Sequence, residues 1–219
     1  MIKGGIPCKR TVLIIGGPGT GKTTLAIQYL VNGILSYGEN GVFVSLDVPK
    51  EKIFEEAKCH AWDLEKFCSE RRIAFVDGSP YARLGYETVG YRMRKTVLHE
   101  PFETVRDAAR SVNAKRICID TLSALTIHYP DVAQRRERII ELFQNLSTIG
   151  ATSIITDEAR ETHERMIPLE EYLADGVIKL QSSQIERKTI RMIEIVKMKA
   201  TGIDEQVRPY VIGEEGLSV

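Results

Sequence analysis

A glycine-rich stretch near the amino terminus constrains this chain more than any other feature. The run Gly16-Gly17-Pro18-Gly19-Thr20-Gly21-Lys22-Thr23 matches the P-loop pattern G-x-x-x-x-G-K-[ST] at every fixed position. Backbone N–H groups of such a loop surround a phosphate, Lys22 reaches the β- and γ-phosphates, and the Thr23 hydroxyl binds the metal ion. The motif predicts a nucleoside triphosphate with Mg²⁺. The expected binding residues are Gly16, Gly17, Pro18, Gly19, Thr20, Gly21, Lys22, Thr23 and Thr24.

The residues around this loop support the motif. Residues 11–15 form a short apolar run rich in β-branched side chains, which is typical of a strand buried on both faces of a parallel sheet. After the loop, Leu25, Ala26, Tyr29 and Leu30 recur at helical spacing. The alternative is a glycine-rich turn that precedes Lys-Thr by chance, and the order of strand, loop and helix disfavours it.

The composition limits the classes of protein that the chain can belong to. Its 219 residues are 43% hydrophobic, which predicts one globular domain over residues 1–219. The 30 basic and 30 acidic residues balance, so no overall charge attracts nucleic acid or anionic lipid. With no apolar stretch near ~20 residues and no signal-peptide core, we expect a cytoplasmic protein without a membrane partner. The cysteines and histidines are too dispersed to predict a metal site.

Strand and helix patterns alternate through the first two thirds of the chain. Further strands are predicted at 42–46, 73–76, 116–120 and 152–156, and helices at 49 to about 60, at 101–112 and in a segment closed by Gly150. This alternation favours an α/β fold with a mainly parallel sheet and helices on both faces. Residues 176–180, 190–199 and 207–219 instead predict antiparallel strands that extend one edge of the sheet, with the last pair joined by a turn around Gly213-Glu214-Glu215-Gly216.

Two aspartates follow buried strands, where the carboxyl ends of a parallel sheet meet. Asp120 ends the apolar run 117–119, and we expect it to hold Mg²⁺ together with Thr23; the alternative is a cap of the next turn. Asp47 closes the strand 42–46 and is the candidate group that orients the attacking water. Its alternative is a helix N-terminal charge favoured by the dipole, and spacing leaves both interpretations open.

The segment from Tyr81 to His99 combines basic and aromatic residues, among them Arg83, Arg92 and Tyr91. Such a mixture suits single-stranded nucleic acid, whose bases stack on rings and whose phosphates meet cations. A solvated helix or a subunit interface is the favoured interpretation, because the segment is short and acidic residues dilute its charge.

Several sequence blocks in one order resemble the KaiC-like branch of the RecA-fold ATPases, which includes archaeal relatives of the RadA recombinase. The resemblance covers nearly the whole chain, and the blocks are Gly4-Gly5-Ile6-Pro7, the P-loop, Val42 to Asp47, Ala61-Trp62-Asp63-Leu64, Ile119 to Leu125, Ile149-Gly150-Ala151-Thr152, Ala174 to Ile178 and Lys197 to Thr201. It implies a RecA-like P-loop NTPase fold, with a mainly parallel central sheet flanked by helices and antiparallel C-terminal strands. It also implies ATP and Mg²⁺ as ligands.

The resemblance also implies an active site between adjacent subunits of a ring or filament. Asp47 stands at the position of the catalytic carboxylate, and Thr156-Asp157-Glu158 resembles the sensor of the γ-phosphate, with Glu158 at its end. Lys197 and Lys199 resemble the pair that reaches into the neighbour's ATP. Alternate residues of an edge strand also often point cations at water, so both interpretations of this pair remain open.

Some positions depart from the family's pattern. Asp47-Val48 stands where two adjacent carboxylates are typical, which predicts slow hydrolysis, and Lys199 stands where arginine is usual. Glu171 and Tyr172 lie in the region of the serine and threonine that KaiC phosphorylates, so we infer neither autophosphorylation nor a circadian clock function. Relatives usually carry a short segment before Gly4, and its lack here predicts weaker subunit contacts.

The leading hypothesis is a slow Mg-ATPase whose nucleotide state sets oligomerisation or partner binding, with another copy of the chain as partner. Its expected catalytic residues are Asp47, Lys22, Glu158, Lys197 and Lys199. The first alternative is a RadA paralogue that binds single-stranded DNA or a recombinase and modulates recombination or repair. The second is a nucleotide switch or scaffold that binds ATP without turnover.

Overall fold

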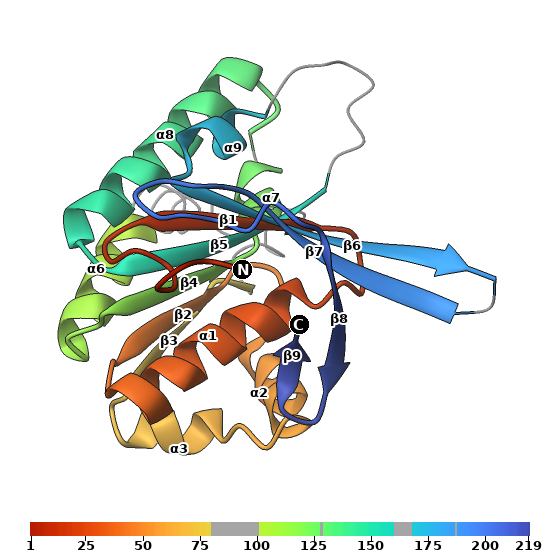
Figure 1. Ribbon diagram of the computed structural model, residues 1–219. Coiled ribbons are helices and arrows are strands. Elements are labelled where there is room, and N and C mark those ends of the chain that lie inside the picture. Colours follow the sequence, from red (N-terminus) through yellow and green to blue (C-terminus); the bar gives the residue numbers. More distant parts are fainter. Residues whose placement is uncertain (80–100, 128, 160–167, 187) are drawn as a thin grey trace.

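A mixed β-sheet forms the centre of the molecule (Figure 1). The computed structural model describes residues 1–79, 101–127, 129–159, 168–186 and 188–219. Within these residues the strands lie in the order β3-β2-β4-β5-β1-β6-β7-β8-β9. The strands are β1 (Thr11–Gly16), β2 (Gly41–Ser45), β3 (Ile73–Asp77), β4 (Arg116–Asp120), β5 (Thr152–Glu158), β6 (Gly176–Ile185), β7 (Lys188–Met198), β8 (Arg208–Gly213) and β9 (Gly216–Ser218). The segment Tyr81 to His99, with its predicted nucleic-acid surface, lies outside the described residues.

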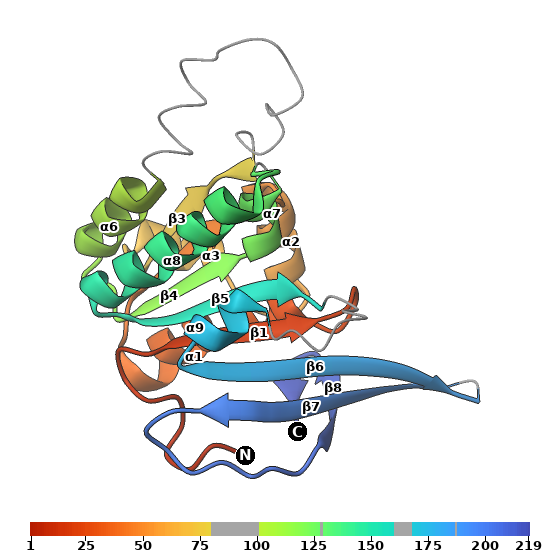
Figure 2. The same ribbon diagram turned by 90° about the horizontal axis from the view of Figure 1, so that it is seen from above.

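The sheet is parallel from β3 to β6, and antiparallel strands follow at that edge. β1 lies between β5 and β6, and the β6–β7 hairpin continues beyond the end of β1, where Gly16 pairs with Leu180 (Figure 2). This is the predicted α/β architecture with antiparallel C-terminal strands. The parallel arrangement places the carboxyl ends of β1, β2, β4 and β5 at one edge of the sheet.

Helices cover both faces of the sheet (Figure 1). α1 (Lys22–Tyr37), α2 (Lys50–Lys58) and α3 (Leu64–Ser69) lie on one face, and α6 (Pro101–Ser111), α7 (Leu122–Thr126), α8 (Val132–Ile149) and α9 (Leu169–Leu173) lie on the other. A hydrophobic core lies on each face of the sheet, and the side chains of β1 point alternately into the two cores. Val12 and Ile14 pack with α1 to α3, while Leu13 and Ile15 pack with α6 to α8. Each large apolar side chain buried in this way contributes about 1.5–3 kcal/mol of transfer free energy.

Element ends differ from the sequence predictions in small ways. β2 ends at Ser45, one residue before the predicted end, and Pro49 is the N-cap of α2 rather than its first helical residue. Gly150 closes α8 as predicted, with a left-handed φ of 74°. The strand pair predicted within 207–219, with its turn around Gly213 to Gly216, is the hairpin of β8 and β9, whereas α3 was not predicted. These shifts leave the order of the elements unchanged.

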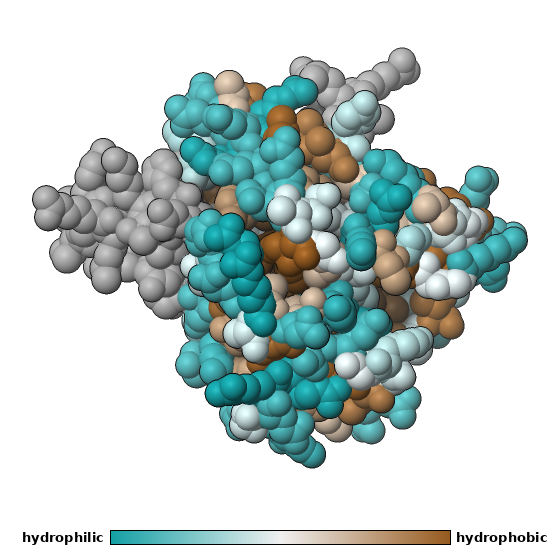
Figure 3. Space-filling view, turned by 90° about the vertical axis from the view of Figure 1, so that its left-hand side faces the viewer, coloured by the Kyte–Doolittle hydropathy of each residue, from teal (hydrophilic) through white to brown (hydrophobic). Residues whose placement is uncertain are grey.

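The surface seen in Figure 3 is mainly hydrophilic, with hydrophobic residues gathered in a hollow near its middle. None of the helices in the described parts of the chain is long and apolar enough to cross a membrane.

Candidate functional site

The P-loop joins the carboxyl end of β1 to the start of α1. Gly19 and Gly21 adopt left-handed φ values of 71° and 85°, and Gly21 is the N-cap of α1. The first turn of α1 contains no acidic residue, and its N-terminal backbone N–H groups lack partners within the helix itself. The positive end of the helix dipole adds to these donors. The loop therefore has the chemistry of an anion site.

Lys22 folds back over the loop that precedes it. Its Nζ donates to the carbonyl oxygens of Gly16 at 2.8 Å and Gly17 at 3.0 Å. Partial burial lowers the pKa of Lys22, against the opposing charges of Asp120, Glu158 and Asp157. The ammonium group thus lies near carboxylates from both β4 and β5.

Asp120 ends β4 and is only 5% exposed. Its Oδ2 accepts from Thr23 Oγ1 at 3.0 Å, and its Oδ1 accepts from the Thr156 hydroxyl of β5. Burial raises the pKa of Asp120, while the bonds from Thr156 and Thr23 and the charge of Lys22 lower it and the charge of Asp47 raises it. A buried carboxylate beside a hydroxyl is a hard oxygen donor set that fits Mg²⁺.

No group of three or more histidine, cysteine, aspartate or glutamate residues in the described ranges could enclose a metal ion. In nucleotide sites Mg²⁺ usually binds one or two carboxylates and completes its shell with phosphates and water. Thr23 and Asp120 are the residues that fit such a role.

Asp47 lies in the bend between β2 and α2, on the same edge of the sheet as Asp120. It is exposed, and the bend is fixed by bonds from Ser45 Oγ to the Val48 carbonyl at 2.5 Å and from Leu46 N to the Asp120 carbonyl at 2.7 Å. Asp77 of β3, rather than Asp47, accepts the N–H of Lys50 at the start of α2, at 3.0 Å. Asp77 therefore takes the hydrogen bond at this helix start, and both interpretations of Asp47, a group that orients water and a helix N-terminal charge, stay predictions.

Glu158 is the last residue of β5 and pairs in register with Gly16, the first residue of the P-loop. It is exposed, whereas Asp157 before it is 1% exposed. The predicted sensor segment thus lies directly beside the loop. Lys22, Thr23, Asp47, Asp120 and Glu158, all named from sequence, meet at one edge of the sheet.

The C-terminal strands bring further residues to the P-loop that the sequence did not single out. The buried hydroxyl of Tyr210 donates to the Thr20 carbonyl at 2.5 Å, and Arg191 Nε donates to the Gly19 carbonyl at 3.4 Å. A Cβ on Gly21 would lie 2.5 Å from Ile212 Cδ1. The two residues of the Tyr210 contact are 190 positions apart in the chain, and those of the Arg191 contact are 172 positions apart. No local spacing could therefore have indicated these contacts.

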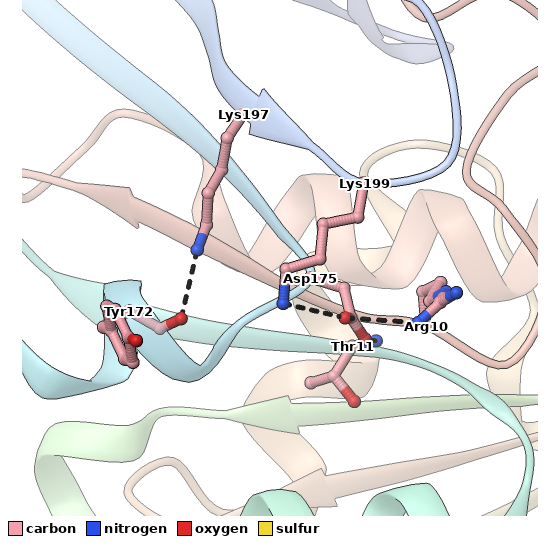
Figure 4. Close-up of polar contacts among 6 residues, drawn as sticks. All are labelled: Arg10, Thr11, Tyr172, Asp175, Lys197 and Lys199. Carbon is pink, nitrogen blue, oxygen red and sulfur yellow. Dashed lines mark hydrogen bonds and ion pairs between the residues drawn. The ribbon is translucent and has the colours of Figure 1, made fainter.

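Lys197 and Lys199 lie toward the opposite end of the sheet from the P-loop. Lys197 pairs with Val177, which lies beside Leu13, and the P-loop begins three residues further along β1, about 10 Å at strand spacing. Lys197 Nζ donates to the Tyr172 carbonyl at 3.3 Å, and Lys199 Nζ to Asp175 Oδ1 at 3.3 Å (Figure 4). Partial burial and then the charge of Lys199 lower the pKa of Lys197. The structure does not bring this pair to the chain's own P-loop.

Comparison with known proteins gives consistent matches along the whole chain. The family model described as "ATPase: KaiC" matches residues 1–219. UPF0273 protein MK0039 of Methanopyrus kandleri is 32% identical over 227 residues, covering 100% of this chain and 87% of that protein. The crystal structure of KaiC-like protein PH0186 from Pyrococcus horikoshii superposes with a TM-score of 0.84 at 32% identity, covering 99% of this chain and 91% of the other.

The circadian clock oscillator protein KaiC of Synechococcus elongatus is 30% identical over 218 residues. That match covers 99% of this chain but only 41% of the relative, so the chain spans about two fifths of the length of that KaiC. The family model and the relatives each match nearly the whole chain. The chain belongs to the KaiC family of ATPases.

Proposed function

We propose that this chain binds Mg-ATP and hydrolyses it slowly, at a site that a neighbouring copy completes. The observation that carries the proposal is the convergence of Lys22, Thr23 and Asp120, which come from the P-loop and from the end of β4. A mobile cation, a hydroxyl and a buried carboxylate in this arrangement are what phosphate and Mg²⁺ binding require.

Each residue has a distinct task in this proposal. The N–H groups of the loop and the Lys22 ammonium stabilise negative charge on the triphosphate, and Thr23 and Asp120 hold Mg²⁺. When bound, Mg²⁺ supplies charge neutralisation at the β- and γ-phosphate oxygens. Asp47 orients the attacking water, and Glu158 senses the γ-phosphate from the end of β5. Because Asp47 is followed by Val48 instead of a second carboxylate, we expect slow turnover.

Lys197 and Lys199 act on the ATP of the neighbouring copy in this proposal. Lys197 and Lys199 lie at the carboxyl end of β7, away from the P-loop of the same copy. To act on the ATP of that copy, they would have to lie further toward the amino end of β7, so their position supports a role in trans. The partner is then a second copy of the chain in a ring or filament. Nucleotide state would set the stability of that assembly, because the triphosphate lies between the two copies.

The alternative of a recombinase paralogue that binds single-stranded DNA rests on Tyr81 to His99, which lie outside the described residues. Fluorescence anisotropy with labelled single strands over a salt series tests it, because binding through phosphates must weaken steeply with salt. Absence of binding at low salt would end this alternative.

Steady-state turnover of Mg-ATP tests the main proposal. Lys22→Ala should abolish ATP binding, whereas Asp47→Ala should retain binding and lose turnover. Lys58→Ala is a suitable control, because Lys58 is an exposed residue of α2 that pairs with Glu65 on the surface. Wild-type turnover by Lys22→Ala would overturn the proposal, and wild-type turnover by Asp47→Ala would remove that residue from it.

A further inference from the structure

One carboxylate at the amino end of the parallel strands holds two cations (Figure 4). Asp175 directly precedes β6, and its Oδ1 accepts from Arg10 Nη1 at 3.4 Å and from Lys199 Nζ at 3.3 Å. Arg10 directly precedes β1, and Lys199 directly follows β7. The three residues therefore come from three chain segments that the sheet brings together.

The backbone fixes the carboxylate more firmly than it fixes the cations. Asp175 Oδ2 accepts the Thr11 N–H at 3.2 Å, the Asp175 N–H donates to the Thr11 carbonyl at 2.8 Å, and the Lys199 N–H donates to the Asp175 carbonyl at 2.8 Å. The Asp175 side chain is 22% exposed, against 43% for Arg10 and 54% for Lys199. Asp175 is thus an ordered support for two solvent-facing cationic groups.

The charges of this group do not cancel. Asp175 carries one negative charge opposite the two positive charges of Arg10 and Lys199. Lys197 adds a further ammonium, whose pKa is lowered by burial and the charge of Lys199 and raised by the carboxylates of Asp175 and Glu171. A guanidinium has five N–H donors, so one bond to Asp175 leaves Arg10 with donors for an incoming anion.

We propose that Asp175 positions Arg10 and Lys199 as one anion-binding pair, and that Arg10 supplies a guanidinium to the triphosphate held by the neighbouring copy. The inference rests on the proposed trans role of Lys197 and Lys199, and it adds two residues to that half of the site. Lys199 stands where arginine is usual, and a lysine cannot offer a planar, bidentate donor to phosphate oxygens. In this proposal the guanidinium of Arg10 supplies that donor instead. Arg10 touches the substrate in this account, whereas Asp175 acts through the two cations.

The alternative is a purely structural role, in which the ion pairs of Asp175 stabilise the packing of the starts of β1 and β6 against the turn after β7. The two roles differ in what they change. Loss of structural ion pairs lowers the unfolding temperature, whereas loss of an anion-binding pair lowers kcat and leaves ATP binding in the P-loop of the same copy intact. Retention of positive charge at position 10 matters only for the second role.

The first experiment measures kcat, KM and thermal unfolding for Arg10→Gln, Arg10→Lys and Asp175→Asn. We expect kcat to fall about tenfold or more in Arg10→Gln, with partial recovery in Arg10→Lys, since trans cations stabilise transition-state charge. Asp175→Asn retains an acceptor for the Thr11 N–H and should also lose kcat. The matched control is Glu65→Gln, which removes the charge of an exposed ion pair on α3. Wild-type kcat in Arg10→Gln would overturn the inference.

The second experiment mixes Lys22→Ala, which we expect to be inactive alone, with Arg10→Gln, which we expect to have a strongly lowered kcat alone. Lys22→Ala retains the cationic half of the site, and Arg10→Gln retains the P-loop half, so mixed assemblies contain sites with both halves intact. We expect activity to reappear on mixing. The reference is the mixture of Lys22→Ala with Lys199→Ala.

Recovery in the reference mixture but not with Arg10→Gln would overturn only the role of Arg10. Recovery in neither mixture would overturn the shared site itself, and this inference with it. The inference and the proposed function therefore fail in distinguishable ways.

Discussion

The hydroxyl of Thr23 donates to Oδ2 of Asp120 across 3.0 Å, joining residues 97 positions apart in the chain. The contact links the first turn of α1 to the end of β4 and lies beside Lys22, whose ammonium acts on the same carboxylate. In the proposed mechanism both oxygens become ligands of Mg²⁺. The two residues that we propose as protein ligands of Mg²⁺ are therefore already joined by a hydrogen bond.

Asp120→Asn should lose Mg²⁺-dependent turnover while it keeps the fold. The amide retains one oxygen acceptor but is a poorer ligand for Mg²⁺ than a carboxylate. Turnover over a Mg²⁺ titration checks this prediction, with Asp63→Asn on the surface turn before α3 as a control. Wild-type activation by Mg²⁺ in Asp120→Asn would contradict it.

The stability of the metal-free protein should depend on the ionisation of Asp120. Burial raises the pKa of this carboxyl above its ordinary value of 3.8, so the folded state keeps the proton to a higher pH than the unfolded chain does. Its contribution to the unfolding free energy therefore decreases as pH rises from 3.8 to the raised folded-state pKa, and it stays lost above that pH.

Asp120→Asn should remove this decrease in the unfolding free energy with rising pH, because the amide does not ionise. Urea unfolding with a chelator at about pH 3.8 and about pH 7.5 checks it, because the wild type should lose more stability between these values than the variant. An identical change in both proteins would exclude a linked ionisation of Asp120.

Asp47→Glu should hydrolyse ATP faster than the wild type. Glutamate lengthens the side chain by one methylene, and Asp47 is exposed in the bend after β2, so the longer carboxylate has room to extend. A several-fold gain in kcat with little change in KM would show that turnover is limited by the placement of this group. Val48→Glu, which restores an adjacent pair of carboxylates, is the companion variant. No gain in either variant would contradict our explanation of slow turnover.

Tyr210→Phe should weaken the P-loop without unfolding the chain. The variant loses the buried bond to the Thr20 carbonyl, worth about 1 kcal/mol of unfolding free energy, and leaves that carbonyl without this donor. We expect lower ATP affinity as the loop loses a support from β8. Tyr37→Phe on the exposed end of α1 is the control. Unchanged affinity in Tyr210→Phe would show that the loop does not depend on β8.

Gly216→Ala should destabilise the β8–β9 hairpin far more than Gly213→Ala. Gly216 has a φ of 92°, and a Cβ there would lie 2.7 Å from the Trp62 ring, whereas a Cβ on Gly213 meets nothing within 4 Å. The strained backbone alone costs about 1–3 kcal/mol. Thermal unfolding of the two variants checks the prediction, and equal unfolding temperatures would contradict it.

The parts of the fold that local pattern determines could be predicted from the sequence. The buried strands β1 and β4, the P-loop and the end of α8 at Gly150 each have a signal within a few residues. Asp120 could be located because an apolar strand leads directly into it. The short helix α3 was missed, although Asp63 caps it by accepting the N–H of Lys66 at 2.9 Å.

Contacts between distant segments could not be predicted in this way. Tyr210 and Arg191 reach the P-loop only because β7 and β8 fold back beside β6, and Asp77 caps α2 only because β3 lies next to β2. Arg10 and Lys199 share Asp175 for the same reason. Such contacts depend on the order and register of the strands in the sheet, which the local sequence pattern does not predict.

The dependence of ATPase activity on protein concentration tests the central claim most directly. Turnover per subunit and mass in solution should be measured together over a dilution series with Mg-ATP. If adjacent copies share the site, turnover per subunit should fall on dilution in step with the assembled fraction. Turnover per subunit that stays constant down to concentrations where the chain is a monomer would contradict the account.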